Sequence, residues 1–150
     1  MTSGPARAGS RDERGQTALL IVGFFAVALL LVVVVVDASA AYLRRQELDA
    51  LADGAALAAA DGLQGESVYT EGLGERAEID PVAARAYVAD YVRLMGVHGR
   101  YPGFTYRVST TPETVEVRVS TRMRLPLQPP GWSERTTVTG TASALVRVTG

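Results

Sequence analysis

The sequence holds few residues whose types and spacing could perform chemistry. It has a single histidine, His98, and no cysteine, so it offers neither a thiolate nucleophile nor a Cys-ligated metal. His98 follows an expected helix end at Gly96, and no second histidine or carboxylate cluster accompanies it. The serines and threonines stand in no G-x-S-x-G or S-x-x-K pattern. We therefore expect a protein that is not an enzyme and that needs no cofactor and no metal.

Charged side chains are the remaining candidates for function. Asp37 directly follows a long apolar run, so it either pairs with a partner protein or with Arg44 two turns along, or it marks where the membrane ends. Arg118, Arg122 and Arg124 share one expected strand face, where they either bind an anionic cell-surface polymer or form a solvated surface. The net charge of −1 argues against nucleic acid as a partner, because nucleic-acid binding requires clustered positive charge.

One apolar segment determines where the protein lies. Residues 17–36 carry no charge, and 15 of these 20 residues are Leu, Ile, Val or Phe. As a helix they span about 30 Å, the thickness of the hydrocarbon core of a bilayer. Arginines are more frequent before this segment than after it, which favours a cytoplasmic N-terminus and an extracytoplasmic body at the cell membrane. These arginines are Arg7, Arg11 and Arg14 before the segment, and Arg44 and Arg45 after it. Residues 1–16 are polar, and we expect them to form a disordered tail.

The same segment raises the question of cleavage. Ala38-Ser39-Ala40 matches the small-x-small pattern of a signal peptidase site, which would cut between Ala40 and Ala41. Against cleavage, 20 apolar residues exceed the usual 7 to 15 of a removable signal. The Ala-rich sequence also continues as a good helix former on both sides of this site. We therefore expect an uncleaved membrane anchor.

Helical sequence continues beyond the apolar segment. Residues 37–61 are rich in Ala and Leu, also carry the helix formers Gln, Glu and Arg, and contain no Pro, so one helix is expected from residue 17 to about residue 60, with Gly62 as its C-cap. Residues 62–80 are rich in Gly and acidic residues and predict a flexible loop. Asp80-Pro81 predicts the start of a second helix that ends at Leu94 or Met95. Its apolar stripe is Ala84, Val88, Tyr91, Val92 and Met95.

After Pro102 the apolar period changes from 3.6 to 2. Three strands are expected, over residues 104–109, 115–125 and 136–148, with a turn at Thr111-Pro112-Glu113. The third has Val138, Ala142, Ala144, Val146 and Val148 on its inward face. Each strand has one apolar face, which requires a cover. The second helix and the outer half of the first can supply it, so the predicted fold class is α+β, with residues 81–150 forming a helix plus an antiparallel sheet.

Small residues surround Asp53 in the outer half of the first helix. Small side chains let a second helix approach closely, so this region is either an assembly contact or the face that packs on the protein's own sheet. The candidate helix-contact residues are Asp37, Arg44, Asp53, Ala56 and Leu57.

Several of these features occur together in one known family. Arg14-Gly15-Gln16, the apolar segment, Asp37, Arg44-Arg45-Gln46 and Ala52-Asp53-Gly54-Ala55-Ala56-Leu57-Ala58 resemble the N-terminal segment of the TadE/TadG-like proteins of the tight-adherence (Flp) pilus system. The order of elements resembles pilins. The resemblance implies a second processing site, between Gly15 and Gln16. Pilin-type processing is associated with Glu at the fifth mature position, which is Leu20 here, so the chain is more similar to the unprocessed TadG-like branch.

Two functional hypotheses follow. The resemblance implies a single-pass, membrane-anchored structural component of a pilus assembly or secretion system, whose partners are other membrane proteins of that system and which forms oligomers through helix packing. The alternative is an anchored or secreted module that binds an envelope ligand on its sheet and uses the helix as a stalk.

Overall fold

The computed structural model describes residues 12–70, 79–127 and 136–146. Three helices precede three strands, in the order α1 (Asp12–Thr70), α2 (Pro81–Leu94), α3 (Val97–Arg100), β1 (Thr105–Thr110), β2 (Thr114–Met123) and β3 (Thr136–Leu145). The strands form one antiparallel sheet in the order β1-β2-β3. This arrangement confirms the α+β class, with a long N-terminal helix, a second helix and a three-stranded antiparallel sheet. The predicted inward residue Val148 lies outside the described residues.

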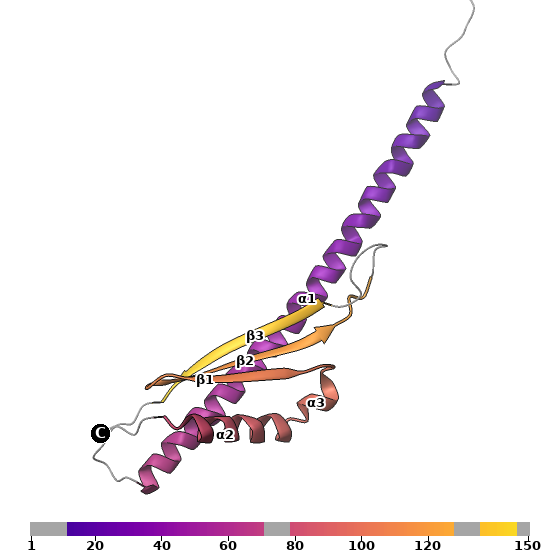
Figure 1. Cartoon of the computed structure of the whole chain (residues 1–150). Coiled ribbons are helices and arrows are strands. Elements are labelled where there is room, and N and C mark those ends of the chain that lie inside the picture. Colours follow the sequence, from indigo (N-terminus) through magenta and orange to yellow (C-terminus); the bar gives the residue numbers. More distant parts are fainter. Residues whose placement is uncertain (1–11, 71–78, 128–135, 147–150) are drawn as a thin grey trace, which may run out of the picture.

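Helix α1 is 59 residues long, about 90 Å, and has two different halves. The first half projects away from the rest of the molecule, and the second half lies along the sheet and beside α2 (Figure 1). Its buried core side chains all come from the second half, at the helical spacing that the sequence indicated. They are Leu48, Ala52, Ala55, Ala56, Ala59, Ala60 and Leu63.

The helix is longer than predicted at both ends. It begins at Asp12, inside the segment expected to be a disordered tail, and it continues through Gly62 to Thr70, inside the segment expected to be a loop. Gly62 is not a C-cap, because it is not among the glycines with positive φ. Instead the ring of Tyr87 lies over it, and a Cβ atom here would come within 2.6 Å of that ring. The lack of a side chain at Gly62 therefore allows α2 to pack closely against α1, and this residue does not end the helix.

Helix α2 begins where the sequence predicts. The Asp80 side chain caps it by accepting a hydrogen bond from the Val82 N–H at 2.8 Å, and Pro81 occupies the first turn. Its buried residues are Ala84, Val88 and Val92, whereas Met95, expected in the same stripe, is exposed. The chain then turns at Gly96, whose φ of +60° favours glycine, into α3, a short helix that was not predicted from the sequence.

The sheet covers α1 with the apolar face of its strands. The turn after β1 lies where predicted, with the Thr111 N–H donating to the Thr114 carbonyl at 2.9 Å. Strands β2 and β3 end at Met123 and Leu145, a little earlier than expected. The core joins Leu48 and the buried alanines of α1 to five strand residues, Val115, Val117, Val119, Val138 and Ala142.

Strand β3 approaches the backbone of α1 at Gly140. A Cβ atom at this position would lie 2.5 to 2.7 Å from backbone atoms of Leu48 and Asp49. Next to this contact, the Thr141 N–H donates to the Asp49 Oδ1 atom at 3.2 Å. The helix and the sheet are therefore in direct backbone contact at this point.

Candidate functional site

The first half of α1 has the dimensions of a membrane anchor. Its apolar window is not buried against the protein at any position, and it belongs to the one helix of the described residues long and apolar enough to cross a bilayer. The exposed side chains of this half include Leu19, Phe24, Leu30 and Val35. Exposed apolar side chains on this scale are unfavourable in water and favourable in lipid.

Asp37 lies at the end of this apolar half and is 7% exposed. Its Oδ1 atom accepts a hydrogen bond at 2.9 Å from the N–H of Leu127, which follows β2. The partner of this carboxylate is therefore a backbone group of the same chain and not Arg44. No local sequence pattern reveals this contact, because the two residues are 90 positions apart.

Two contacts within the protein hold the Arg44 side chain in place. Its Nη1 atom donates to Glu47 Oε2 at 2.8 Å, and its guanidinium lies 5.2 Å from the centre of the Tyr101 ring. A cation above an aromatic face is attracted by the ring quadrupole. This arginine therefore connects α1 to the turn between α3 and β1.

The remaining helix-contact candidates divide between two faces of α1. Ala56 is 1% exposed and belongs to the core, whereas Asp53 and Leu57 are exposed. These two belong to a longer exposed stripe with alternating spacings of three and four residues, which is the spacing of a coiled-coil seam. We call it the exposed helix face, and its members are Leu43, Gln46, Ala50, Asp53 and Leu57.

Both candidate processing sites lie within the uninterrupted helix α1. Gly15 and Gln16 are near its start, and Ala40 and Ala41 follow the apolar half by one turn. Ala40 and Ala41 are half-buried.

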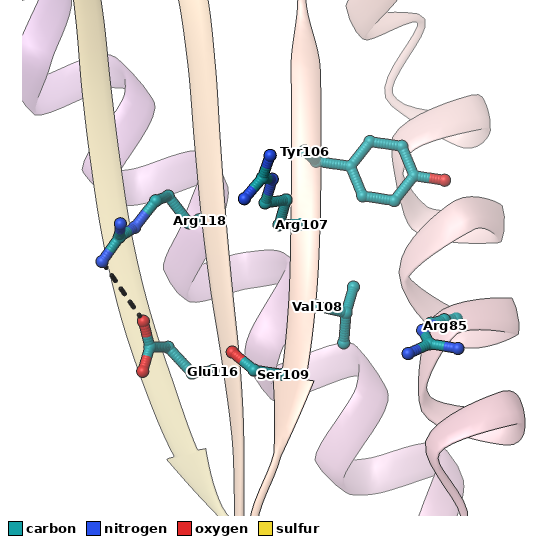
Figure 2. A pocket seen from close by; sticks show the side chains of 7 residues that line it. All are labelled: Arg85, Tyr106, Arg107, Val108, Ser109, Glu116 and Arg118. Carbon is teal, nitrogen blue, oxygen red and sulfur yellow. Dashed lines mark ion pairs between the residues drawn. The ribbon is translucent and has the colours of Figure 1, made fainter.

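Arginines of the sheet line two separate pockets, although the sequence pattern places them on one strand face. Arg118 lies with Arg85 and Arg107 around a pocket of about 600 Å³ beside β1, where Arg118 pairs with Glu116 at 3.7 Å (Figure 2). Arg122 and Arg124 lie with Arg44 around a second pocket of about 490 Å³. Arg107 and Arg118 lie opposite each other on β1 and β2. The sequence could have predicted this pair only if the register of the two strands had been known.

The lone histidine packs against an aromatic ring. His98 and Phe104 form an edge-to-face pair with their ring centres 5.4 Å apart. Within the described residues, no group of three or more His, Asp or Glu side chains is placed to hold a metal ion.

These features define a class of protein, namely a small α+β body carried on the outer half of a helix whose inner half has the properties of a single membrane anchor. Residues 15–62 match the family described as "Putative Flp pilus-assembly TadE/G-like". The match spans about a third of the chain and falls entirely within α1, so the predicted resemblance to TadE/TadG-like proteins is confirmed for this segment. No curated protein and no solved structure matches the chain significantly.

Proposed function

We propose that this chain is a non-enzymatic, single-pass membrane component of a TadE/TadG-like Flp pilus assembly or secretion system. The observation that carries the proposal is that the family match extends beyond the apolar half of α1 and includes the exposed helix face. In this proposal the N-terminus is cytoplasmic and the body lies on the extracytoplasmic side. Leu20, at the position where processed pilins have Glu, supports an uncleaved chain of the TadG-like type.

The proposed mechanism is structural. Helix α1 fixes the body at a set distance from the membrane, and the exposed helix face packs against a helix of a neighbouring pilus-system protein or of a second copy. Ala50 permits close approach of that helix, and Leu57 adds apolar contact. Asp53, in the same stripe, requires a hydrogen-bond donor or a cation on the partner helix, because an unpaired carboxylate is costly to bury.

A photo-crosslinking experiment tests this contact. The chain has no cysteine, so the variants Ala50→Cys and Leu57→Cys can each be labelled with benzophenone maleimide in host membranes. We expect both to form adducts with another pilus-system protein or with a second copy. Ala86→Cys is the matched control, because Ala86 is also an exposed helical alanine but lies on α2. Equal adduct yields at Ala50 and Ala86, or none at Ala50 and Leu57, would contradict the proposed contact.

The proposed anchor has a separate test, the mass and N-terminal sequence of the C-terminally tagged chain from host membranes and medium. An intact chain in the membrane fraction is expected. A start at Gln16 would indicate pilin-type processing and a filament subunit. A start at Ala41 in the medium would rule out the anchor.

The alternative function, ligand binding by the sheet, is favoured by one observation. The pocket beside β1 is lined by Arg85, Arg107 and Arg118 and by a single carboxylate, Glu116, which pairs with Arg118 (Figure 2). In this case Arg107→Gln together with Arg118→Gln would abolish function in the host, and Ala50→Leu and Leu57→Gln on the exposed helix face would not. The opposite pattern supports the assembly role.

A further inference from the structure

We propose that the end of the body nearest the apolar half of α1 binds the phosphate headgroups of anionic phospholipids in the membrane that holds the helix. The binding group is the basic cluster, defined as Arg44, Arg122 and Arg124. This inference rests on the proposed membrane anchor, and it adds a lipid site on the body that the anchor alone does not require.

The basic cluster is assembled from distant parts of the chain. Arg44 comes from α1, whereas Arg122 and Arg124 come from the end of β2 and the residue that follows it, and the three line one pocket of about 490 Å³ with Pro102 and Gly103. A pocket of this size is large enough for a phosphodiester group with part of its glycerol.

The turn from Tyr101 to Gly103 holds two of these arginines in place. The Tyr101 ring lies beneath the Arg44 guanidinium, and the aliphatic stem of Arg122 lies against Gly103, where a Cβ atom would be 3.3 Å from Arg122 Cδ. The turn itself is fixed to β2 at the Pro102 carbonyl, which accepts hydrogen bonds from the Arg122 N–H at 3.1 Å and the Thr121 hydroxyl at 2.8 Å. The site is therefore supported by the fold and does not depend on free surface side chains alone.

The basic cluster lies at the level expected for headgroups. Asp37 directly follows the apolar segment, and Arg44 is two turns further along α1, about 10 Å from that boundary. The headgroup layer is roughly 5 to 8 Å thick on each side of the hydrocarbon core, and an arginine side chain spans the remaining distance. Tyr42, which is exposed at the same level of α1, is of a type enriched at membrane interfaces.

A contact between the body and the anchor brings the strand end to the same level. The Leu127 N–H donates to Asp37, and Leu127 is an exposed apolar residue at the membrane boundary. Arg124 is three residues before it, at most about 10 Å away along the chain. The extension of β2 therefore brings the exposed apolar residue Leu127 and the nearby Arg124 to the level of the proposed membrane boundary.

The charges around the basic cluster leave it positive. Glu47 pairs with Arg44, and the carboxylate of Asp37 keeps its negative charge, since its partner is the neutral Leu127 N–H. The three arginines still outnumber these two carboxylates. In the part of the chain that the structure describes, neither Arg122 nor Arg124 has an ion pair. Guanidinium groups bind phosphate oxygens through two parallel N–H donors, which makes arginine well suited to phosphodiesters.

The test measures lipid preference of the full chain. The protein is reconstituted in nanodiscs with equal amounts of phosphatidylglycerol and phosphatidylcholine, released into mild detergent, and its retained lipids are counted by native mass spectrometry. We expect the wild-type chain to retain phosphatidylglycerol preferentially. In the variant Arg44→Gln/Arg122→Gln/Arg124→Gln the preference should fall about tenfold or more, since each arginine near an anionic surface contributes appreciably to binding. The arginines before the apolar segment are present in every variant and give a constant background.

A control of equal charge distinguishes a site from general attraction. The variant Arg85→Gln/Arg107→Gln/Arg118→Gln removes the same number of charges from the pocket beside β1 and should keep the wild-type preference. An equal loss in both triple variants would overturn the inference. Because Arg44 also contacts Glu47 and Tyr101, the double variant Arg122→Gln/Arg124→Gln is measured as well, and it should lose a large part of the preference with unchanged circular dichroism. An unchanged preference in it would also overturn the inference.

Two further measurements distinguish a lipid site from a soluble-phosphate site and from a failure of the helix to insert. Inorganic phosphate is titrated against the lipid-bound protein at constant ionic strength. If a phosphate concentration below about 1 mM displaces the bound phosphatidylglycerol, the site belongs to a soluble phosphate ligand and the lipid assignment is overturned. Insertion is checked by carbonate extraction of the chain from pure phosphatidylcholine vesicles. A chain that resists extraction but shows no lipid preference contradicts only this inference, whereas an extractable chain contradicts the anchor.

Discussion

At the scale of single residues, the contact between Asp37 and Leu127 ties the end of the apolar half of α1 to the chain that follows β2. A carboxylate at the end of an apolar segment is expected to face water, but here it is largely buried and accepts a backbone hydrogen bond. Removing one partner of such a bond leaves the other unsatisfied, at a cost of about 1 to 3 kcal/mol.

The first prediction concerns this bond. Asp37→Ala should increase hydrogen-deuterium exchange of the Leu127 amide in the detergent-solubilised full chain, because the acceptor is lost. Asp37→Asn retains an acceptor oxygen and should exchange almost as slowly as the wild-type chain. Asp53→Ala is the control, since it removes an exposed carboxylate from the same helix. Unchanged exchange in Asp37→Ala would show that the bond does not hold the strand extension.

The second prediction concerns the close approach of β3 to α1. Gly140→Ala places a methyl group against the backbone of Leu48 and Asp49, which cannot rotate away as a side chain can. We expect a loss of at least about 2 kcal/mol in the free energy of unfolding, since overpacking in a filled core commonly costs about 1 to 3 kcal/mol. The measurement is urea unfolding followed by circular dichroism.

The control for Gly140 is Gly65→Ala. Gly65 is a helical residue of α1, and the space that an added Cβ atom would occupy there is open. Alanine at this position should stabilise the helix by up to about 1 kcal/mol. If both variants were equally stable, the contact between α1 and β3 would be looser than the structure shows.

At the scale of elements, the sequence predicts those parts whose signals are local. The second helix was predicted correctly because Asp80 caps it and Pro81 starts it, and the strands because alternation directly reports a half-buried sheet. The predicted end of α1 was wrong because a glycine at this position can either end a helix or allow another helix to pack closely against it. Only the position of Tyr87, on another helix, decides between them.

The site was harder to predict than the fold. The sequence indicated that Asp37, Arg44 and the arginines of β2 were unusual, but their partners come from turns and strands far away in the chain. The Tyr101–Gly103 turn is next to Arg44 and Arg122 only because three elements meet there. Such long-range contacts have no periodicity that one sequence could reveal.

The third prediction concerns the cap of α2. Asp80→Ala should lower the free energy of unfolding by about 1 kcal/mol, because the Val82 N–H loses its acceptor. Asp80→Ser keeps an acceptor and should recover most of that loss. Thermal unfolding of the full chain in detergent measures both. Equal stability of the alanine and serine variants would mean that the cap contributes little to the fold.

At the scale of the whole molecule, the body cannot be separated from α1 at an arbitrary position. Leu48, Ala52, Ala55 and Ala59 are fully buried in the core, although they belong to the same helix as the anchor. The boundary of the foldable unit therefore lies inside α1, before Leu48.

The fourth prediction follows from this boundary. A chain that begins at Asp61 lacks most of the core contributed by α1 and should show no cooperative unfolding transition. A chain that begins at Ala41 keeps that core and should unfold cooperatively, although without the bond from Asp37. Circular dichroism during heating measures both. Cooperative unfolding of the shorter chain would mean that the sheet and α2 suffice as a core.

The unbroken course of α1 has a mechanical consequence. Within the described residues no proline or turn interrupts the helix from Asp12 to Thr70, so the anchor and the body share one stiff rod. A tilt of about 10° in the bilayer would carry the far end of the core, about 40 Å beyond Val36, sideways by about 7 Å. In the proposed membrane-anchored protein, α1 would act as a lever that pivots at the membrane surface. A force on the body would then reach the lipid, and a force in the lipid would reach the body, without a hinge in α1 to absorb it.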